Sequence, residues 1–479
     1  MTNYLAVDLG ATSGRTVLAS FDGERIHMRE FTRFDNPQLP LGGHIFWDLP
    51  HLYNEIIKAL RLIHAENIEL QSIGIDTWGC DFAFFGADGQ LLGLPYCYRD
   101  AHTDGAPERF FSEVMPRDDV YSRTGIQFMP FNSLFQLDTL RRAGSVALQN
   151  ATKILFIPDA LIYMLTGEAV CEFTVASTSQ MLNPMTRDLD DDLLAAVGLQ
   201  RSRFGRMVQP GQLVGYLSEQ VQAATGVASL PVIAVGSHDT ASAVAAVPAT
   251  DDRFAYLSCG TWSLLGVESD KPIINADSMA ENFTNEGGLD GTTRFLKNIT
   301  GLWLYEQCRR EWNTATGDNA DANSVPADVN KLNALAMTSD IQSIIEPDDP
   351  RFAHPASMTA AIREYLTETG QPLPSTPADY VRIIFRSLAQ RYATVVDSLR
   401  RLTNVDIQRL HVIGGGSRNE YLMQFAADAL HMPVIAGPQE GTALGNVMTQ
   451  VRAHGDITTL TQMRDIISRS IELKTYLPK

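Results

Sequence analysis

The chain has 479 residues, 44% of them hydrophobic and 20% charged, which allows two or three globular domains with full cores. Its formal net charge of −18 argues against nucleic acid or an anionic membrane as a partner, because both attract positive protein surfaces. The five cysteines are scattered without a CxxC pair, and we find neither a secretory signal nor an apolar run of about 20 residues. We therefore expect a reduced cytoplasmic protein without disulfides or a zinc site.

The first predicted element is a β-hairpin. Two apolar runs, residues 4–7 and 16–19, flank the turn Gly10-Ala11-Thr12-Ser13-Gly14. Glycine lets a ligand approach the backbone closely, and hydroxyl and N–H groups can hold phosphate oxygens. Asp8 at the strand end could bind Mg²⁺, and Arg15 could reach a phosphate. The alternative is an ordinary hairpin in which these residues serve the turn geometry.

Helices and strands then alternate. Apolar residues at helical spacing predict a helix over residues 51–64, and residues 71–76 predict a short strand. Residues 158–166 predict a further helix that stops at Gly167. This alternation is typical of a layered α/β domain with helices on the faces of a sheet.

The predicted strand over residues 71–76 ends in a group of residues suited to a sugar. Asp76, Trp78 and Gly79 follow one another closely there. Carboxylates can bind sugar hydroxyls, and an aromatic face can cover the C–H groups. The alternative is a strand end with a buried tryptophan.

Another apolar strand, residues 230–235, leads through Ser237-His238-Asp239-Thr240 into an alanine-rich helix. Asp239 would lie at the carboxyl end of the strand, where α/β sheets usually bind ligands, and could accept the proton of an attacking alcohol. The alternative is a helix N-cap formed by Asp239 or Thr240. Adjacent residues cannot converge into a Ser/His/Asp triad, so His238 is expected to be structural.

A second hairpin repeats the pattern of the first. Residues 254–257 and 264–267 flank the turn Gly260-Thr261-Trp262-Ser263. This repeat favours a nucleotide clamped across a cleft between related domains. We place the boundary between residues 1–240 and residues 241–479. Residues 318–355, rich in Asn, Asp, Ala and Pro, are expected to form a surface excursion.

A glycine run follows a strand predicted over residues 410–413. Gly414, Gly415 and Gly416 precede a helix, for which Ser417 and Glu420 predict a capping box. Such a turn suits nucleotide phosphates or ribose, because no side chain blocks the backbone. The alternative is a glycine turn needed for tight packing. The spacing disfavours a dinucleotide-binding motif.

Taken together, these motifs resemble the FGGY carbohydrate kinases along nearly the whole chain. The strings that carry the resemblance are Val7 to Arg15, Ile75 to Gly79, Gly125 to Phe128, Ser237 to Ser242, Gly260 to Ser263, Lys297 to Trp303, Gly414 to Ser417 and Gly437 to Asn446. The resemblance implies an α/β fold with two actin/Hsp70-like (ribonuclease H-like) ATPase domains and a cleft between them. It also implies that the last helix packs back on the first domain.

The resemblance further assigns roles to single residues. Asp239 would be the catalytic base, and Asp8 would orient Mg²⁺ bound with ATP. The sugar-binding residues would be Asp76, Trp78, Gly79, His238, Asp239, Thr240 and Asn298. The nucleotide-binding residues would be Ala11, Thr12, Ser13, Gly14, Arg15, Thr261, Glu306, Gly414, Gly415 and Gly416. Glu306 stands where other members place a glutamine.

The implied reaction is ATP-dependent phosphorylation of a ketose at its 1-hydroxyl, with L-rhamnulose, from L-rhamnose breakdown, as the expected substrate. Another ketose such as L-fuculose or L-xylulose is the first alternative, since it would share every phosphate motif. A non-catalytic sugar sensor is the second alternative. Sugar and ATP are the expected small-molecule partners.

Overall fold

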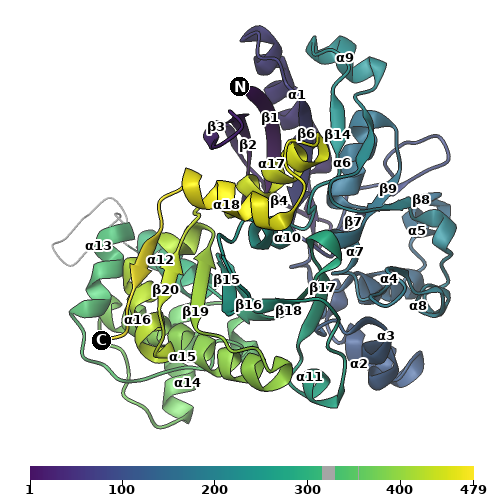
Figure 1. Cartoon of the computed structure of the whole chain (residues 1–479). Coiled ribbons are helices and arrows are strands. Elements are labelled where there is room, and N and C mark those ends of the chain that lie inside the picture. Colours follow the sequence, from purple (N-terminus) through teal and green to yellow (C-terminus); the bar gives the residue numbers. More distant parts are fainter. Residues whose placement is uncertain (316–328, 354) are drawn as a thin grey trace. The chain divides into compact units, whose positions relative to one another are not determined.

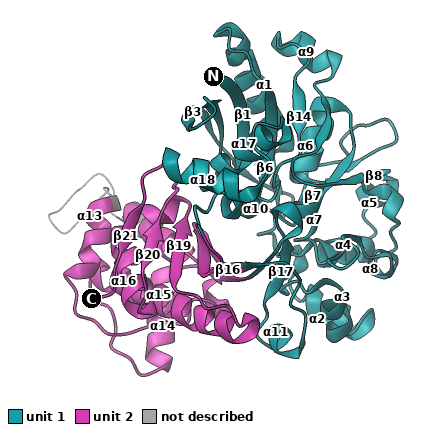
Figure 2. Cartoon of the chain, viewed as in Figure 1, with its two compact units in different colours: residues 1–250, 268–295, 441–470 teal, residues 251–267, 296–440, 471–479 magenta. Residues whose placement is uncertain are grey.

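The computed structural model of the protein describes residues 1–315, 329–353 and 355–479 (Figure 1). These residues form two compact units, coloured separately in Figure 2. Unit 1 consists of residues 1–250, 268–295 and 441–470, and unit 2 of residues 251–267, 296–440 and 471–479. The chain therefore passes from one unit to the other at 250/251, 267/268, 295/296, 440/441 and 470/471.

Unit 1 contains most of the short strands and helices. Its strands are β1 (Thr2–Leu9), β2 (Ser13–Phe21), β3 (Ile26–Asp35), β4 (Gln38–Leu41), β5 (His44–Trp47), β6 (Ser72–Thr77), β7 (Phe82–Phe85), β8 (Lys153–Phe156), β9 (Val170–Glu172), β10 (Leu182–Asn183), β11 (Asp188–Leu189), β12 (Arg206–Val208), β13 (Leu213–Tyr216), β14 (Pro231–Ile233) and β17 (Thr284–Gly287). Its helices are α1 (Leu49–Ala65), α2 (Ala106–Glu113), α3 (Arg117–Thr124), α4 (Ser133–Arg142), α5 (Val146–Asn150), α6 (Ile157–Thr166), α7 (Phe173–Ala176), α8 (Asp191–Ala196), α9 (Glu219–Thr225), α10 (Asp239–Ala245), α11 (Ala276–Ala280), α17 (Gly441–Ala453) and α18 (Leu460–Ser470).

The central sheet of unit 1 has the strand order β13-β14-β6-β1-β2-β3. β1 pairs antiparallel with β2 and parallel with β6, and β6 pairs parallel with β14. The predicted first hairpin and the strand at residues 71–76 are thus confirmed. Because β1 and β6 run in parallel, their carboxyl ends lie side by side at one edge of the sheet.

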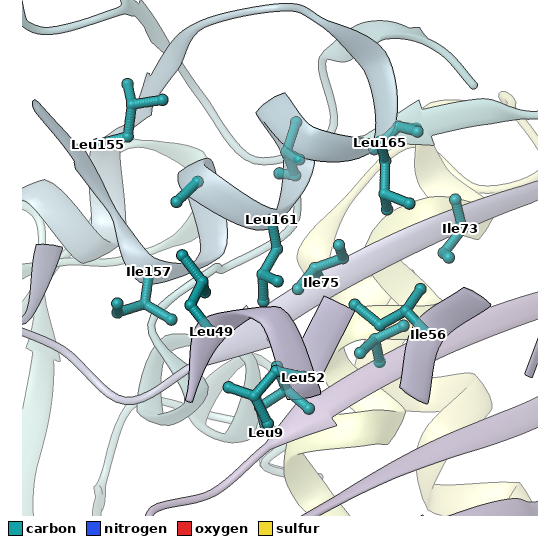
Figure 3. Close-up of a cluster of buried hydrophobic side chains, with 14 of the residues drawn as sticks. Leu9, Leu49, Leu52, Ile56, Ile73, Ile75, Leu155, Ile157, Leu161 and Leu165 are labelled. Atoms are coloured by element: carbon teal, nitrogen blue, oxygen red, sulfur yellow. The ribbon is translucent and has the colours of Figure 1, made fainter. Parts of the chain in front are cut away.

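Alternate residues of these strands face two different helical layers. Leu9, Ile73 and Ile75 pack with Leu52 and Ile56 of α1 in a large apolar core (Figure 3). The helix predicted over residues 51–64 therefore lies on this face, as its apolar spacing requires. Its N-cap is Asp48, whose side chain accepts a hydrogen bond from the His51 backbone.

The opposite face of the sheet is covered by α10 and α17. The side chain of Gln450 on α17 binds Ser72 Oγ at 2.8 Å and donates to the Leu5 carbonyl at 3.1 Å. A Cβ atom added to Gly445 would lie 1.8 Å from the Ser242 carbonyl oxygen, so α17 and α10 approach each other through backbone. Helices thus cover both faces, which confirms the predicted α/β layering.

Unit 2 is built on a second sheet. Its strands are β15 (Phe254–Cys259), β16 (Trp262–Ser269), β18 (Thr293–Thr300), β19 (Arg409–Ile413), β20 (Val434–Ala436) and β21 (Lys474–Tyr476). Its helices are α12 (Trp303–Ala315), α13 (Val329–Ala334), α14 (Met358–Glu368), α15 (Pro377–Thr403) and α16 (Glu420–Leu430).

The unit 2 sheet repeats the plan of unit 1. Among the described residues, the sheet has seven strands in the order β17-β18-β16-β15-β19-β20-β21, of which the last six are those just given. The pair β15–β16 is antiparallel, β15–β19 and β19–β20 are parallel, and β20–β21 is antiparallel. The predicted hairpin repeat is therefore one part of a repeated sheet topology.

One local prediction in unit 2 is wrong, and a second is contradicted in the part that the structure describes. Ser417 and Glu420 form no capping box: the N-cap of α16 is Asn419, whose side chain accepts from the Leu422 backbone, and Ser417 Oγ donates to the Gly414 carbonyl inside a 3₁₀ turn. Residues 318–328 and 354 of the predicted surface excursion lie outside the described residues. In its described part, Leu332 and Phe352 are fully buried, so that part contributes to the core of unit 2.

None of the helices in the described part of the chain is both long and apolar enough to span a membrane. All five cysteines are buried and free.

Candidate active site

Two carboxylates meet at the carboxyl edge of the unit 1 sheet. Asp8 of β1 and Asp76 of β6 are direct partners in the parallel register. Both occupy positions that face the layer of α10 and α17, because side chains alternate along a strand. Asp8 retains slight exposure, whereas Asp76 is fully buried.

The turn of the first hairpin is braced from both sides. Arg15 donates through Nε and Nη2 to Asp8 Oδ2 at 3.0 and 2.7 Å. Asn36, just beyond β3, donates from Nδ2 to the Gly10 carbonyl at 2.9 Å, and its backbone N–H donates to the Thr12 carbonyl at 3.1 Å. Thr12 is exposed at the tip of the turn.

Gly14 of the same hairpin serves packing. A Cβ atom at this position would lie 2.3 Å from the Phe34 ring. Its predicted nucleotide contact is therefore limited to its backbone.

Asp76 is held from the α17 side. Asn446 donates to Asp76 Oδ2 at 2.6 Å, while Oδ1 has no hydrogen-bond partner among the described residues. Burial raises the pKa of Asp76 well above its ordinary value, and the neighbouring charges of Asp8 and Asp239 raise it further, against the hydrogen bond from Asn446. Asp76 has the surroundings of an internal carboxyl, and its predicted contact with sugar stays a prediction.

Residues 237–240, called the 237–240 loop below, follow β14 and include the first two residues of α10, and they lie beside β6. The Thr77 N–H donates to the Ser237 carbonyl at 2.8 Å, and the His238 N–H donates to Thr174 Oγ1 at 3.1 Å. Asp239 is the first residue of α10, and His238 is its N-cap without a side-chain capping bond. The capping alternative for Asp239 and Thr240 is therefore wrong.

The Asp239 carboxyl is oriented within this loop. Thr240 Oγ1 donates to Asp239 Oδ1 at 3.1 Å, and about a third of the Asp239 side chain, 33%, is exposed. Desolvation by the surrounding protein raises the pKa of Asp239; His238 opposes this shift, Asp8 adds to it, and the hydrogen bond from Thr240 opposes it. A desolvated carboxylate with an open side is suited to accept a proton from a bound hydroxyl.

His238 connects Asp239 to two further charged residues. Its Nε2 lies 3.5 Å from Asp239 Oδ1, and its Nδ1 lies 3.3 Å from Glu286 Oε2 and 3.2 Å from Arg294 Nη2. The sequence predicts a structural histidine here, and the burial of His238 agrees with that prediction. Its contact with Asp239 also places it next to the candidate base.

Trp78 and Gly79 lie just beyond β6. The Trp78 ring packs at 4.3 Å from the Trp47 ring, and both indole N–H groups donate to Asp81. Burial raises the pKa of Asp81 to about 6, against these hydrogen bonds. A Cβ atom on Gly79 would lie 2.7 Å from Thr178 Oγ1, so this glycine is required for packing. Sugar contacts of Trp78 and Gly79 stay predictions.

The predicted residues of unit 2 lie around its own hairpin turn and the glycine run. The Thr261 carbonyl accepts from the Trp303 N–H at 3.2 Å, which fixes the turn to the start of α12. Asn298 is half-buried on β18. Glu306 of α12 forms an ion pair with Arg309 at 2.7 Å, which balances the carboxylate that departs from the family pattern.

The three glycines of unit 2 differ in their surroundings. Gly414 has φ of 85°, which favours glycine, and a Cβ atom on Gly416 would lie 2.3 Å from Cys259 Sγ. A Cβ atom on Gly415 would meet nothing within 4 Å. Packing thus explains Gly416, while Gly415 borders open space.

Comparison with known proteins decides the family. Residues 3–246 match the N-terminal domain of the FGGY family of carbohydrate kinases, and residues 255–454 match its C-terminal domain. The chain belongs to the FGGY family of carbohydrate kinases. This confirms the resemblance, and it makes the protein a carbohydrate kinase.

Relatives within the FGGY family cover the whole chain. A protein of Bacteroides thetaiotaomicron named rhamnulokinase is 54% identical over 477 residues, covering 100% of this chain and 96% of the relative. A rhamnulokinase of Pectobacterium carotovorum is 43% identical and covers 100% of this chain and 93% of the relative.

Solved structures confirm the FGGY fold. Gluconate kinase from Lactobacillus acidophilus matches with a TM-score of 0.79 at 17% identity, covering 100% of this chain and 94% of that one. A ligand-bound xylulose kinase from the same organism matches with a TM-score of 0.80 at 16% identity over the same shares of the two chains.

Sequence reasoning missed several residues that hold the FGGY site together. They are Asn36, Asn446, Gln450, Thr174, Glu286 and Arg294. Each is distant in sequence from the residue that it contacts, so no local motif indicates the contact, although Asn446 itself ends the family string of residues 437–446.

Proposed function

We propose that this FGGY kinase transfers the γ-phosphoryl group of ATP to the 1-hydroxyl of L-rhamnulose, giving L-rhamnulose 1-phosphate and ADP in L-rhamnose breakdown. The observation that carries the choice of substrate is the 54% identity, across the whole chain, to a relative named rhamnulokinase. Asp239, the one-third-exposed carboxyl at the sheet edge, supports catalysis over a silent sugar sensor.

Asp239 is the proposed general base. The oxygen of the sugar 1-hydroxyl forms a bond to the γ-phosphorus, the bond from that phosphorus to the ADP oxygen breaks, and the hydroxyl proton passes to Asp239. The Oδ1 atom is oriented by Thr240, which leaves Oδ2 on the other side of the carboxyl for this proton. Most of the acceleration comes from in-line positioning and stabilisation of phosphate charge.

Asp8 and Arg15 are proposed to serve the phosphate end of ATP. Arg15 brings a positive charge to the hairpin turn, whose backbone at residues 10–13 is positioned by Asn36. Among the described residues, no group of three or more His, Cys, Asp or Glu side chains could hold a metal ion by itself. This fits Mg²⁺ held by one carboxylate together with nucleotide phosphates, and Asp8 Oδ1 would be its protein ligand. When bound, Mg²⁺ neutralises phosphate charge.

In unit 2, Gly415 is the residue best placed to face the nucleotide. The open space beside its Cα would admit a flat base. By contrast, the positive φ explains the glycine at 414, and close packing against Cys259 explains the glycine at 416. Thr261 is the proposed phosphate contact of the second hairpin. The contacts of Asn298 with sugar and of Glu306 with nucleotide remain proposals from the family pattern.

A coupled ADP-release assay with Mg-ATP tests the proposal. The panel is L-rhamnulose, L-fuculose, L-xylulose, D-xylulose, L-ribulose and glycerol. We expect the highest kcat/KM with L-rhamnulose. Preference for another ketose would keep the kinase and replace the substrate, and no turnover with any of them would favour the sensor.

The isosteric Asp239→Asn variant supplies the mechanistic control for this assay. We expect it to lose at least about 10²-fold in kcat, the lower end of general-base contributions, because its amide cannot take the proton. Nearly full activity would remove Asp239 from the role of base.

A further inference from the structure

Two buried charged residues that this mechanism does not use face the 237–240 loop. Glu286 lies on β17 and Arg294 at the start of β18, whose residues 293–295 belong to unit 1, and their side chains are 5% and 0% exposed. Arg294 Nη2 lies 3.1 Å from Glu286 Oε2, and Arg294 Nε donates to the Gly287 carbonyl at 2.8 Å. The guanidinium is therefore fixed in direction as well as in place.

The pair carries opposite charges deep inside unit 1. Burial would raise the pKa of Glu286, but the charge of Arg294 and the proximity of His238 outweigh it and lower that pKa, so the carboxyl is ionised. Buried ion pairs often stabilise a fold no better than apolar side chains of similar size. A stabilising role alone therefore gives little reason to place this pair against His238.

The geometry at His238 Nδ1 determines where the imidazole carries its proton. A guanidinium can only donate hydrogen bonds, so the 3.2 Å contact from Arg294 Nη2 requires Nδ1 to accept. Glu286 Oε2, 3.3 Å from Nδ1, would favour the opposite tautomer, but only the Arg294 contact has hydrogen-bond geometry, since Glu286 Oε2 accepts no hydrogen bond from a described residue. The neutral ring then carries its proton on Nε2, the nitrogen 3.5 Å from Asp239 Oδ1.

We infer that Arg294, fixed by Glu286 and the Gly287 carbonyl, is a positioning residue that holds His238 as the Nε2–H tautomer, so that it donates toward Asp239 Oδ1. With Thr240 also donating to Oδ1, the second oxygen of Asp239 is kept for the sugar hydroxyl. The consequence for catalysis rests on the proposed function, whereas the tautomer is a property of the free protein.

The tautomer is measured by ¹⁵N–¹H NMR of the full-length protein labelled at histidine. The spectrum is taken without ligands at about pH 8.5, roughly two units above an ordinary imidazole pKa, so that neutral rings dominate. The His238 signals among the 10 histidines are identified by their loss in His238→Gln. We expect a protonated Nε2 and a bare Nδ1, and a protonated Nδ1 would overturn the inference.

Two variants separate the effects of the two charges. Arg294→Met removes the donor and leaves Glu286, so the proton of His238 should move to Nδ1. Glu286→Gln keeps Arg294 and should keep the Nε2–H tautomer. An unchanged tautomer in both variants, or the same change in both, contradicts the inference.

Arg294→Met leaves a buried carboxylate unpaired and could fail to fold. The double variant Glu286→Gln/Arg294→Met removes both charges, and we expect a mixture of tautomers there. A single Nε2–H tautomer in the double variant would show that the pair does not set it.

Kinetics then test the positioning role. In Arg294→Met we expect kcat/KM for the preferred sugar to fall by about tenfold or more, the effect of losing one hydrogen bond to a charged group, with KM for ATP unchanged. Glu286→Gln should lose less. A changed tautomer with unchanged turnover overturns the positioning role. Failure of the L-rhamnulose assignment would leave the NMR result intact.

Discussion

At the scale of a single residue, the surroundings of Asp239 act on its protonation in opposite directions. Desolvation and the nearby charge of Asp8 favour its neutral form, whereas His238 and the Thr240 hydroxyl favour the carboxylate. A base must be ionised to accept a proton, so activity should fall as pH decreases through the raised pKa of Asp239. The acid limb of kcat/KM should therefore lie above the ordinary Asp value of 3.8.

Replacing Thr240 by valine tests this origin of the acid limb. Valine keeps the shape but removes the 3.1 Å hydrogen bond that favours the ionised form. The pKa of Asp239 should rise further, and the acid limb should move to higher pH in the Thr240→Val profile. A limb that stays in place or moves to lower pH would contradict the assignment to Asp239.

Glu172 provides a second test at the residue scale, on stability. It is fully buried, and its Oε2 accepts from the Thr174 backbone and hydroxyl and from the Val175 backbone. Burial raises the pKa of Glu172 from 4.5 to about 7, against these hydrogen bonds. The folded state thus binds its proton more tightly than the unfolded state, and this contribution is full below about pH 4.5 and lost as pH rises through about 7.

We expect the pH dependence of unfolding to differ between wild type and Glu172→Gln. From about pH 4.5 to above 7 the wild type should lose on the order of 3 kcal/mol that the variant does not lose. Urea unfolding of both proteins at pH 5 and pH 8 measures the change in unfolding free energy between the two pH values for each protein. Parallel profiles would show that Glu172 titrates normally in the folded protein.

At the scale of elements, the glycine run between β19 and α16 combines two different requirements. Gly416 packs against Cys259, whereas Gly415 borders open space. Gly415→Trp should leave the melting temperature nearly unchanged but raise KM for ATP by about tenfold or more, because the ring would occupy the proposed nucleotide space.

Gly416→Ala is the matched control for that variant. Its methyl group would lie 2.3 Å from Cys259 Sγ, and such overpacking costs about 1–3 kcal/mol of stability. Thermal unfolding together with ATP kinetics separates the two positions. Unchanged KM for ATP in Gly415→Trp would remove Gly415 from the nucleotide site.

The elements also show what sequence could predict. The hairpins, the strand before Asp76 and the helix of residues 51–64 follow from local periodicity and turn residues, and they are confirmed. The predicted capping box failed because Asn419, one residue before α16, offers its side chain to the same helix start. Local sequence patterns predict where a helix or strand lies, but they do not show which of several neighbouring residues caps a helix.

Contacts between distant elements were beyond sequence reasoning. Asn446 ends one of the family strings, but nothing in that string predicts that it donates to Asp76, which lies 370 residues earlier. Glu286 and Arg294 likewise become meaningful only when β17 and β18 bring them to His238. The family strings predicted Asp8 and Asp239, whereas the residues that position them depend on tertiary packing.

At the scale of the whole molecule, the sheet of unit 1 depends on the end of the chain. On the face that α10 and α17 cover, Ser72 and Asp76 form hydrogen bonds with Gln450 and Asn446 of α17. A fragment of residues 1–250 should therefore bind ANS and lack near-UV circular dichroism, because one face of its sheet keeps α10 but loses α17. Attaching residues 441–470 through a flexible linker should restore part of the signal. Cooperative unfolding of the fragment alone would contradict this.

The division into domains is also a property of the whole chain. Each unit is assembled from three segments, whereas the sequence suggested one boundary after residue 240. That boundary, and the return of the last helix to the first domain, stay predictions. The repeated strand order in the two sheets was visible in sequence only as the pair of hairpins, because equivalent strands share hydrophobicity but not motifs.

The late position of α17 has a consequence for biosynthesis. A ribosome adds about 5–20 residues per second, so the interval between residues 250 and 441 lasts roughly 10–40 s. During that time the nascent first sheet exposes Ser72 and Asp76 with no helix to bond them. We expect this unfinished surface to be more prone to aggregation than the complete unit, because Ser72 and Asp76 then lack their partners on α17.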